Sequence, residues 1–267
     1  MSGWPRWAQE IVNYSLSIVA LLLFWQLVHW GAQLLFPPIH PKFPNPRAQI
    51  LPGPLEAFGA LLGNWRETSR DLQASGVRLI LGLLISLFTA APLGLIIGTG
   101  RRLNGLLTPL IYTIYPIPKV VFWPVLLILF GIGENSKVSF IVLMVFFQIL
   151  LSARDAAQHI PASYIISALA AGAKRGQLFW HVILPASLPE IFTSLRVSLG
   201  IGVAALYIAE TAIRPRFGLA KTISQSAYPL VAGRLYAEIV ALAFLGLVLY
   251  IAIEALERFI CRWKYLE

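Results

Sequence analysis

Lys119 and Glu210 lie deep inside long apolar stretches of the chain, in the only predicted spans that carry a charge near mid-bilayer. A charge at that depth is costly unless it faces water, a ligand or an opposite charge. Lys119 could therefore line a polar pathway and attract an anion. A Lys119–Glu210 ion pair is a second possibility. A third is structural, because Pro116 and Pro118 free backbone carbonyls that the Lys119 ammonium group could bind.

Other residue types with chemical potential give weaker signals. Tyr115 and Tyr207 could line the same pathway, although aromatic residues in spans more often pack or anchor at the interface. The four histidines lie far apart with no metal-ligand spacing, so no metal site is expected. The chain has no G-x-x-x-x-G-K-[ST] loop and cannot cradle ATP phosphates itself. Polar residues do not cluster at a span end, so an enzyme is not expected.

The composition defines the elements that must position these residues. Hydrophobic residues make up 58% of the 267 residues and charged residues only 12%, which excludes a soluble class. The net charge of +9 does not indicate nucleic-acid binding, because the basic residues lie at span ends, where anionic lipid headgroups account for them. The single cysteine, Cys261, excludes an internal disulfide.

The apolar stretches predict an all-α membrane protein with one transmembrane domain over residues 1–267. A span needs about 20 apolar residues, which predicts six spans, at about 15–36, 76–99, 106–130, 136–152, 191–213 and 235–260. Pro116, Pro118 and Pro124 are predicted to interrupt the third span. The prolines from Pro37 to Pro46 predict an extended loop, and Pro54–Trp65 predicts a short interfacial helix. Close helix contact is expected at four glycines, namely Gly94, Gly98, Gly200 and Gly202.

Residues 161–190 form a polar-flanked island between the fourth and fifth spans. Ser163 is predicted to cap a short helix, and Gly172 to end it with a left-handed residue. The helix would present a small apolar ridge made by Ile165, Ile166, Leu169 and Ala170. Apolar side chains held outside the bilayer indicate a docking surface for a partner. The pattern alone is equally compatible with a re-entrant or interfacial loop.

The island also resembles the cytoplasmic coupling loop of permease subunits of bacterial ABC importers. Gly172, Val182 and Leu184–Pro185 match that loop, whereas Ile166, Ser167 and Ala168 occupy its Glu-Ala-Ala positions without the acidic residue. The resemblance covers roughly residues 75–260. Five further segments are similar to the branch that imports nitrate, sulfonates, taurine or bicarbonate, namely YPIPK (115–119), FGIGENSK (130–137), VILPASLPEI (182–191), LRVSLG (195–200) and AET (209–211).

The resemblance implies a permease subunit of an ATP-driven importer for a small anion, or alternatively for a thiamine-precursor-like solute. It implies a second permease copy, ATPase subunits that carry ATP and magnesium, and a periplasmic or lipid-anchored substrate-binding protein. The pathway residues predicted from their depth, charge and residue type are Lys119, Glu210, Tyr115 and Tyr207. The implied ATPase-docking residues are Ser163, Ile166, Ala168, Leu169, Ala170, Ala171, Gly172, Lys174, Arg175, Leu184 and Pro185.

An even number of spans places both termini on the side of the island. The short basic Arg101–Arg102 turn lies on that side and favours the cytoplasm, as expected for a multi-pass protein of the bacterial inner membrane. Residues 214–235 would then face the periplasm with a basic surface, which either receives the binding protein or is a solvated loop that contacts lipid headgroups. An ion-coupled secondary transporter is the alternative class, but the internal repeat typical of that class is absent.

Overall fold

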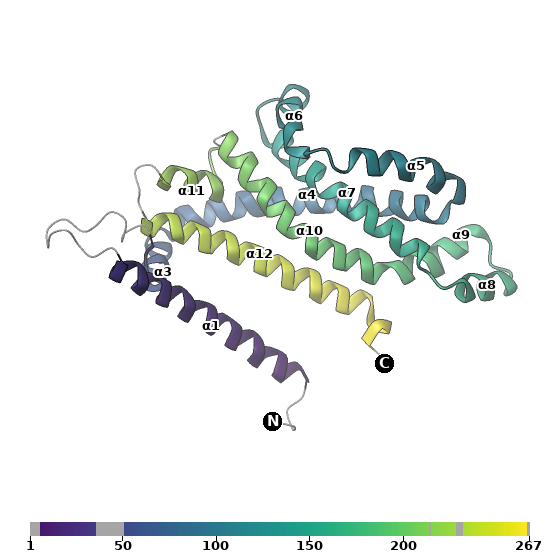
Figure 1. Cartoon of the computed structure of the whole chain (residues 1–267), viewed down its shortest axis with the longest axis horizontal. Coiled ribbons are helices and arrows are strands. Elements are labelled where there is room, and N and C mark those ends of the chain that lie inside the picture. Colours follow the sequence, from purple (N-terminus) through teal and green to yellow (C-terminus); the bar gives the residue numbers. More distant parts are fainter. Residues whose placement is uncertain (1–5, 36–50, 214, 228–231, 266–267) are drawn as a thin grey trace. The chain divides into compact units, whose positions relative to one another are not determined.

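A computed structural model describes residues 6–35, 51–213, 215–227 and 232–265, and every regular element in these ranges is a helix. Among these described residues, five helices are long and apolar enough to cross a membrane, or six if one bent pair counts as a single span (Figure 1). The predicted all-α architecture is therefore confirmed. The predicted proline-rich loop between Pro37 and Pro46 lies outside the described residues.

The helices that carry the long apolar stretches are longer than predicted. The second span is part of α4 and the fourth is part of α7, and the fifth begins seven residues earlier than expected, at Leu184. The spanning helices outside the bent pair are α1 (Arg6–Leu35), α4 (Trp65–Thr99), α7 (Glu134–Gln158), α10 (Leu184–Ala212) and α12 (Ala232–Ile260). The shorter helices include α3 (Pro54–Gly63), as predicted, and α11 (Leu219–Ala227).

The third span is broken. Helix α5 (Arg101–Ile114) ends before Pro116, and a 3-10 turn (Lys119–Phe122) begins after Pro118 and leads into α6 (Trp123–Phe130). The two halves meet at an angle of 84°. Proline has no N–H group and disfavours helical conformation in the residue before it, which explains why the helix stops here. The break places Lys119 at the corner between the two halves.

The chain divides into two compact units. The first contains the described residues up to Ser69 together with those of Thr222–Ala241. In this unit His29 is buried, donates through Nδ1 to the Leu51 carbonyl at 2.6 Å, and accepts from Gln33 Nε2 at 3.0 Å. Thr68 donates to the buried Glu238 at 2.8 Å. These bonds satisfy polar groups that would otherwise be buried without partners.

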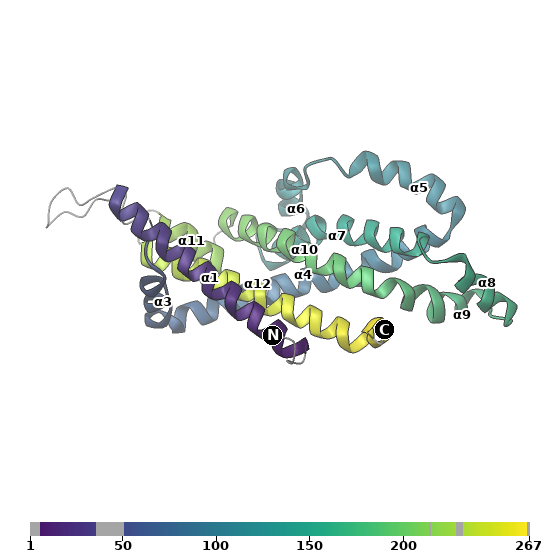
Figure 2. The same cartoon turned by 60° about the horizontal axis from the view of Figure 1, so that its bottom comes forward.

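The second unit, Arg70–Lys221 with Leu242–Glu267, contains the helices that matter for function. Helices α4, α7 and α10 lie side by side in both views (Figures 1 and 2). A Cβ atom on Gly94 would lie 2.8 Å from the Ala153 Cβ and against the Leu150 carbonyl, and one on Gly202 would lie 2.9 Å from Leu79. Close approach is therefore confirmed at Gly94, Gly98 and Gly202, whereas a Cβ on Gly200 would meet nothing within 4 Å.

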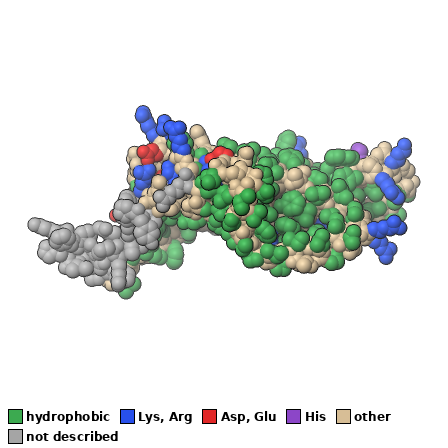
Figure 3. Space-filling view, turned by 90° about the horizontal axis from the view of Figure 1, so that it is seen from above, with side chains coloured by type: hydrophobic (Ala, Val, Ile, Leu, Met, Phe, Trp, Pro, Cys, Tyr) green, Lys and Arg blue, Asp and Glu red, His purple; other side chains and the backbone are tan. Residues whose placement is uncertain are grey.

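Large apolar side chains are exposed along the spans, as in Leu21 (67%) and Ile128 (84%). In Figure 3 hydrophobic side chains cover the face over α5 and α6, and Lys and Arg gather at the end that carries the island helices. Exposed apolar surface of this extent is stable in lipid and not in water. The chain is a multi-pass membrane protein.

The contact between α4 and α7 predicts the effect of a single methyl group. Gly94→Ala should lower the thermal unfolding midpoint of the detergent-purified protein, because overpacking typically costs about 1–3 kcal/mol. Alanine is intrinsically the better helix former, so the matched control Gly246→Ala, whose Cβ meets nothing within 4 Å, should be neutral or stabilising. Equal midpoints for the two variants would contradict the packing described above.

Candidate docking and translocation sites

The island folds into short helices that expose apolar side chains. Helix α8 spans Ala162–Ala170, α9 spans Arg175–Leu178, and a π-helical turn (Phe179–Ile183) leads into α10. On α8, Ile166 is 63% exposed and Leu169 is 51% exposed. Among the docking residues predicted from the sequence, the exposed ones are Ser163, Ile166, Leu169, Ala170, Ala171, Gly172, Lys174 and Arg175; Ala168, Leu184 and Pro185 are half-buried.

Gly172 ends α8 as predicted. Its φ of +82° lies in the left-handed region, its N–H donates to the Leu169 carbonyl at 2.9 Å, and the Ala173 N–H donates to the Ala168 carbonyl at 3.0 Å. These two bonds form a Schellman motif, which closes the helix and turns the chain sharply. The turn leaves the apolar side chains of α8 on a protruding hairpin.

The prediction that Ser163 caps α8 is wrong. The helix begins at Ala162, its N-cap residue is Pro161, and no side chain caps it. Leu184 and Pro185 also differ from expectation, since they form the first turn of α10 and do not end a loop. Proline is favoured in the first turn of a helix, where its missing N–H group costs nothing. As a result, only the π-helical turn separates α9 from the spanning helix.

Lys119 and Glu210 do not pair. The Lys119 ammonium group donates to the Tyr115 carbonyl at 2.6 Å and lies 4.3 Å from the centroid of the Tyr115 ring. It also lies 5.4 Å from the Phe147 ring centroid. The structural alternative, in which Lys119 binds a carbonyl freed by the prolines, is therefore the arrangement observed. Within the described residues, no carboxylate forms an ion pair with Lys119, so its charge is not neutralised.

Glu210 lies instead at the centre of a buried network. Its carboxylate is fully buried and accepts from Arg78 Nη1 at 2.5 Å, from Ser75 Oγ at 2.7 Å and from the Ala220 N–H at 3.0 Å. Arg78 also donates to both oxygens of Glu134, which Lys137 binds at 2.9 Å. The network joins α4, the first turn of α7, α10 and the start of α11.

Arg78 is a residue that the sequence prediction missed. It lies near the start of the predicted span 76–99, away from mid-bilayer, and its side chain is buried. Arg196 was missed as well: it lies within the predicted span 191–213, the span that also contains Glu210, and it pairs with the buried Glu257. A charged residue inside an apolar stretch was the available signal in both cases.

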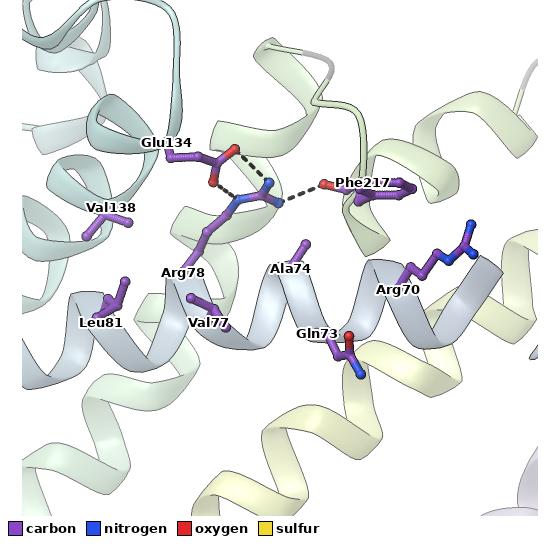
Figure 4. A pocket seen from close by; sticks show the side chains of 9 residues that line it. All are labelled: Arg70, Gln73, Ala74, Val77, Arg78, Leu81, Glu134, Val138 and Phe217. Carbon is purple, nitrogen blue, oxygen red and sulfur yellow. Dashed lines mark hydrogen bonds and ion pairs between the residues drawn. The ribbon is translucent and has the colours of Figure 1, made fainter. Parts of the chain in front are cut away.

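An open groove of about 600 Å³ lies beside this network (Figure 4). In Figure 4 the Arg78 guanidinium points toward Glu134 and the Phe217 carbonyl, to which it donates at 2.9 Å. Because Glu134 and Glu210 neutralise Arg78, the groove does not offer Arg78 as a free cation for an anion. Its lining residues are Arg70, Gln73, Ala74, Val77, Arg78, Leu81, Glu134, Val138 and Phe217.

A second polar cluster ties α5 to α7. The Asn104 side-chain oxygen accepts from Arg154 Nε at 2.9 Å and from Gln158 Nε2 at 2.7 Å. Arg154 is buried and also donates to the Tyr112 hydroxyl at 3.2 Å. Further along the same two helices, the Tyr115 hydroxyl donates to Gln148 at 3.3 Å. These bonds hold α5, which leads to Tyr115 and Lys119, against α7. The other predicted pathway tyrosine, Tyr207, lies exposed on α10.

Within the ranges that the structure describes, no three or more His, Cys, Asp or Glu side chains come together in a group that could hold a metal ion. The membrane-length helices define a multi-pass membrane protein from which the α8 hairpin protrudes. The chain belongs to the family of binding-protein-dependent transport system inner membrane components, whose pattern matches residues 90–261. It is a permease subunit and not an enzyme.

Similar proteins support this assignment. The chain is 32% identical over 266 residues to the taurine transport system permease protein TauC of Escherichia coli, covering 97% of this chain and 92% of TauC. It is 24% identical to the bicarbonate transport system permease protein CmpB of Synechococcus elongatus, and the match covers 98% of this chain and 94% of CmpB. A chain of the MetNI methionine ABC transporter in an inward-facing conformation shares the fold, with a TM-score of 0.60 and 18% sequence identity. The match covers 75% of this chain and 96% of the MetNI chain.

The buried network predicts which lysine or arginine stabilises the fold. Arg78→Met leaves the Glu210 carboxylate buried without its cation, and breaking such a pair typically costs about 3–5 kcal/mol. Lys119→Met should retain the thermal unfolding midpoint, because Lys119 pairs with no carboxylate in the described part of the chain. Adding Glu210→Gln to Arg78→Met should recover part of the loss. A larger loss of stability in Lys119→Met than in Arg78→Met would contradict the assignment.

Proposed function

We propose that this chain is the pore-forming subunit of an ATP-driven importer, and that separate ATPase subunits dock on the island. The observation that carries the proposal is the exposed apolar face of α8, which is held in a defined shape by the left-handed Gly172. Exposed apolar side chains beside small residues allow a partner helix or groove to approach closely. ATP and magnesium would be bound by the partner, since this chain has no phosphate-binding loop.

The island and residues 215–221 lie at opposite ends of one spanning helix. Helix α10 has 29 residues, which corresponds to about 43 Å at about 1.5 Å per residue. The hydrocarbon layer is about 30 Å thick. This length supports placing α8 and residues 215–221 on opposite sides of the membrane. The orientation proposed has α8 and both termini in the cytoplasm and residues 215–221 in the periplasm. Arg216 and Lys221 belong to that periplasmic segment, whereas Arg214 and residues 228–231 lie outside the described residues.

The substrate proposed is a small anion, such as a sulfonate or bicarbonate. Two relatives that cover nearly the whole chain are named for taurine and bicarbonate transport. Taurine carries a sulfonate group beside an ammonium group, so what the two named solutes share is an anionic group of oxygen atoms. A shorter match, 30% identical over 164 residues and 61% of the chain, is to the riboflavin transport system permease protein RibX of Chloroflexus aurantiacus. The substrate-binding protein is therefore the component expected to select among solutes.

Lys119 and Tyr115 are the residues proposed to meet the anion, with Tyr207 as a further pathway residue. The Lys119 charge has no carboxylate partner in the described ranges and lies at the corner of the broken span. Glu210 is fully buried and satisfied by its neighbours, which supports a structural role for it. If Lys119 meets the anion, Lys119→Met should lower uptake without loss of assembly. Undiminished uptake by that variant would exclude this role.

Two copies of the chain are proposed to form the pore, each with one ATPase subunit on its α8. ATPase closure would push on the island, and α10 would carry the displacement toward the periplasmic end as a rigid body. A substrate-binding protein would deliver the solute from outside. An ion-coupled secondary transporter would not need the docking surface on α8.

The docking proposal predicts the effect of a charge on α8. Ala170→Arg or Ala171→Arg should abolish co-purification of the ATPase subunits, because an unpaired charge and a long side chain would enter a close apolar contact. The permease itself should remain folded, since both positions are exposed. Gln225→Arg, at an exposed position of α11, is the matched control and should retain the ATPase subunits. Normal co-purification of both α8 variants would refute docking at this surface.

A further inference from the structure

The segment Phe217–Ala220 is held by side chains from distant helices. Three consecutive backbone N–H groups donate to side-chain oxygens: Gly218 to Asp71 at 2.8 Å, Leu219 to Ser75 at 3.0 Å and Ala220 to Glu210 at 3.0 Å. The Phe217 carbonyl accepts from Arg78 at 2.9 Å. Every one of these partners lies on α4 or α10. We call the set Asp71, Ser75, Arg78 and Glu210 the cradle.

The cradle replaces a local helix cap. The first N–H groups of a helix have no partner within the helix and are usually satisfied by a side chain just before it. At the start of α11 the acceptors instead come from residues more than 100 positions away in sequence or from the end of α10. The backbone shape of Phe217–Ala220 therefore depends on how α4 and α10 are placed.

In and beside the segment that the cradle holds, some side chains are buried and others are exposed to the surroundings. Pro215 and Gly218–Ala220 are buried, whereas Arg216 is exposed. The Lys221 ammonium group donates back to the Arg216 carbonyl at 2.8 Å and is half-buried. Within 215–221, Arg216 is thus the cation that reaches outward.

We propose that Asp71, Ser75 and Glu210 are positioning residues for recognition of the substrate-binding protein. They fix Phe217–Ala220 so that Arg216 meets an acidic patch on that protein. The inference rests on the proposed function, in which this segment faces the periplasm. An exposed charge of this kind contributes to association rate and register, and its contribution depends on where the backbone holds it. The cradle connects that placement to α10, the helix that begins at the island.

Gly218 offers a test that removes no polar group. A Cβ on Gly218 would lie 2.6 Å from Glu210 Oε2 and 2.7 Å from its Cδ. Ser75 and Arg78, which lie outside the segment, both donate to that carboxylate, so Gly218→Ala should displace the backbone of the segment and not the carboxylate. Ser75→Ala is a second variant, because it removes the acceptor of the Leu219 N–H without adding volume. Gly246→Ala, with nothing within 4 Å of its Cβ, is the control.

The experiment uses the complete complex with its ATPase subunits. The rate of ATP hydrolysis is measured at increasing concentrations of the purified cognate binding protein, which gives a half-saturating concentration and a maximal rate. Gly218→Ala and Ser75→Ala should each raise the half-saturating concentration about three- to ten-fold, which is the scale of one lost hydrogen bond. The maximal rate at saturation should be retained. A role in folding alone would reduce the amount of complex and leave the half-saturating concentration unchanged.

A double-variant cycle separates the cradle from other effects. In an Arg216→Ala background, Gly218→Ala should have little additional effect, because the cradle acts through Arg216. Fully additive effects, or a half-saturating concentration equal to that of the Gly246→Ala control, would overturn the inference while the proposed function stands. If the binding protein fails to stimulate the unmodified complex, the proposed function itself fails, and the inference fails with it.

Discussion

The ion pair between Arg78 and Glu210 is the interaction on which the rest of this structure depends. A guanidinium group and a carboxylate in the interior of a membrane protein are tolerated only when each finds its partners within the protein. Arg78 meets this requirement with two carboxylates and a backbone carbonyl, and Glu210 meets it with a cation, a hydroxyl and a backbone N–H. The same contacts fix the first turn of α7, the last turn of α10 and the beginning of α11 against α4.

Helix α10 connects this network to the docking island. It begins at Leu184, directly after the π-helical turn that follows α8 and α9, and it carries Glu210 in its last turn. Close packing of α4 through Gly94, Gly98 and Gly202 leaves few voids in which a displacement could be absorbed. In the proposed function, a push on α8 would therefore move α10 and its neighbours together and would couple ATP hydrolysis to the periplasmic end.

Much of the fold and of the docking site follows from local sequence patterns. Six apolar stretches, the broken third span and the left-handed Gly172 depend on composition, prolines and a single glycine, so short-range rules are sufficient. The start of α10 was predicted too late because Pro185 was interpreted as the end of a loop, although proline is equally suited to a first helical turn. Ser163 was predicted to be a cap for a similar reason, since more than one nearby residue can begin a helix.

The partners of the buried charges could not be predicted in the same way. Lys119 and Glu210 have opposite signs and comparable depth, but pairing depends on which helices adjoin, and residues that are far apart in sequence carry no spacing signal for that. Arg78 is the actual partner of Glu210, and a carbonyl freed at the proline corner is the partner of Lys119. These assignments leave Lys119 as the charged residue of the proposed pathway and move Glu210 into the structural network.

The most direct test of ATP-driven import is transport by proteoliposomes that contain the permease with its ATPase subunits. The solute would be the ligand that mass spectrometry identifies on the purified cognate binding protein. We predict uptake when ATP is available to the ATPase subunits and the loaded binding protein is on the opposite side, and no uptake when either is omitted. Uptake driven by an ion gradient in the absence of ATP would contradict the proposal and indicate a secondary transporter.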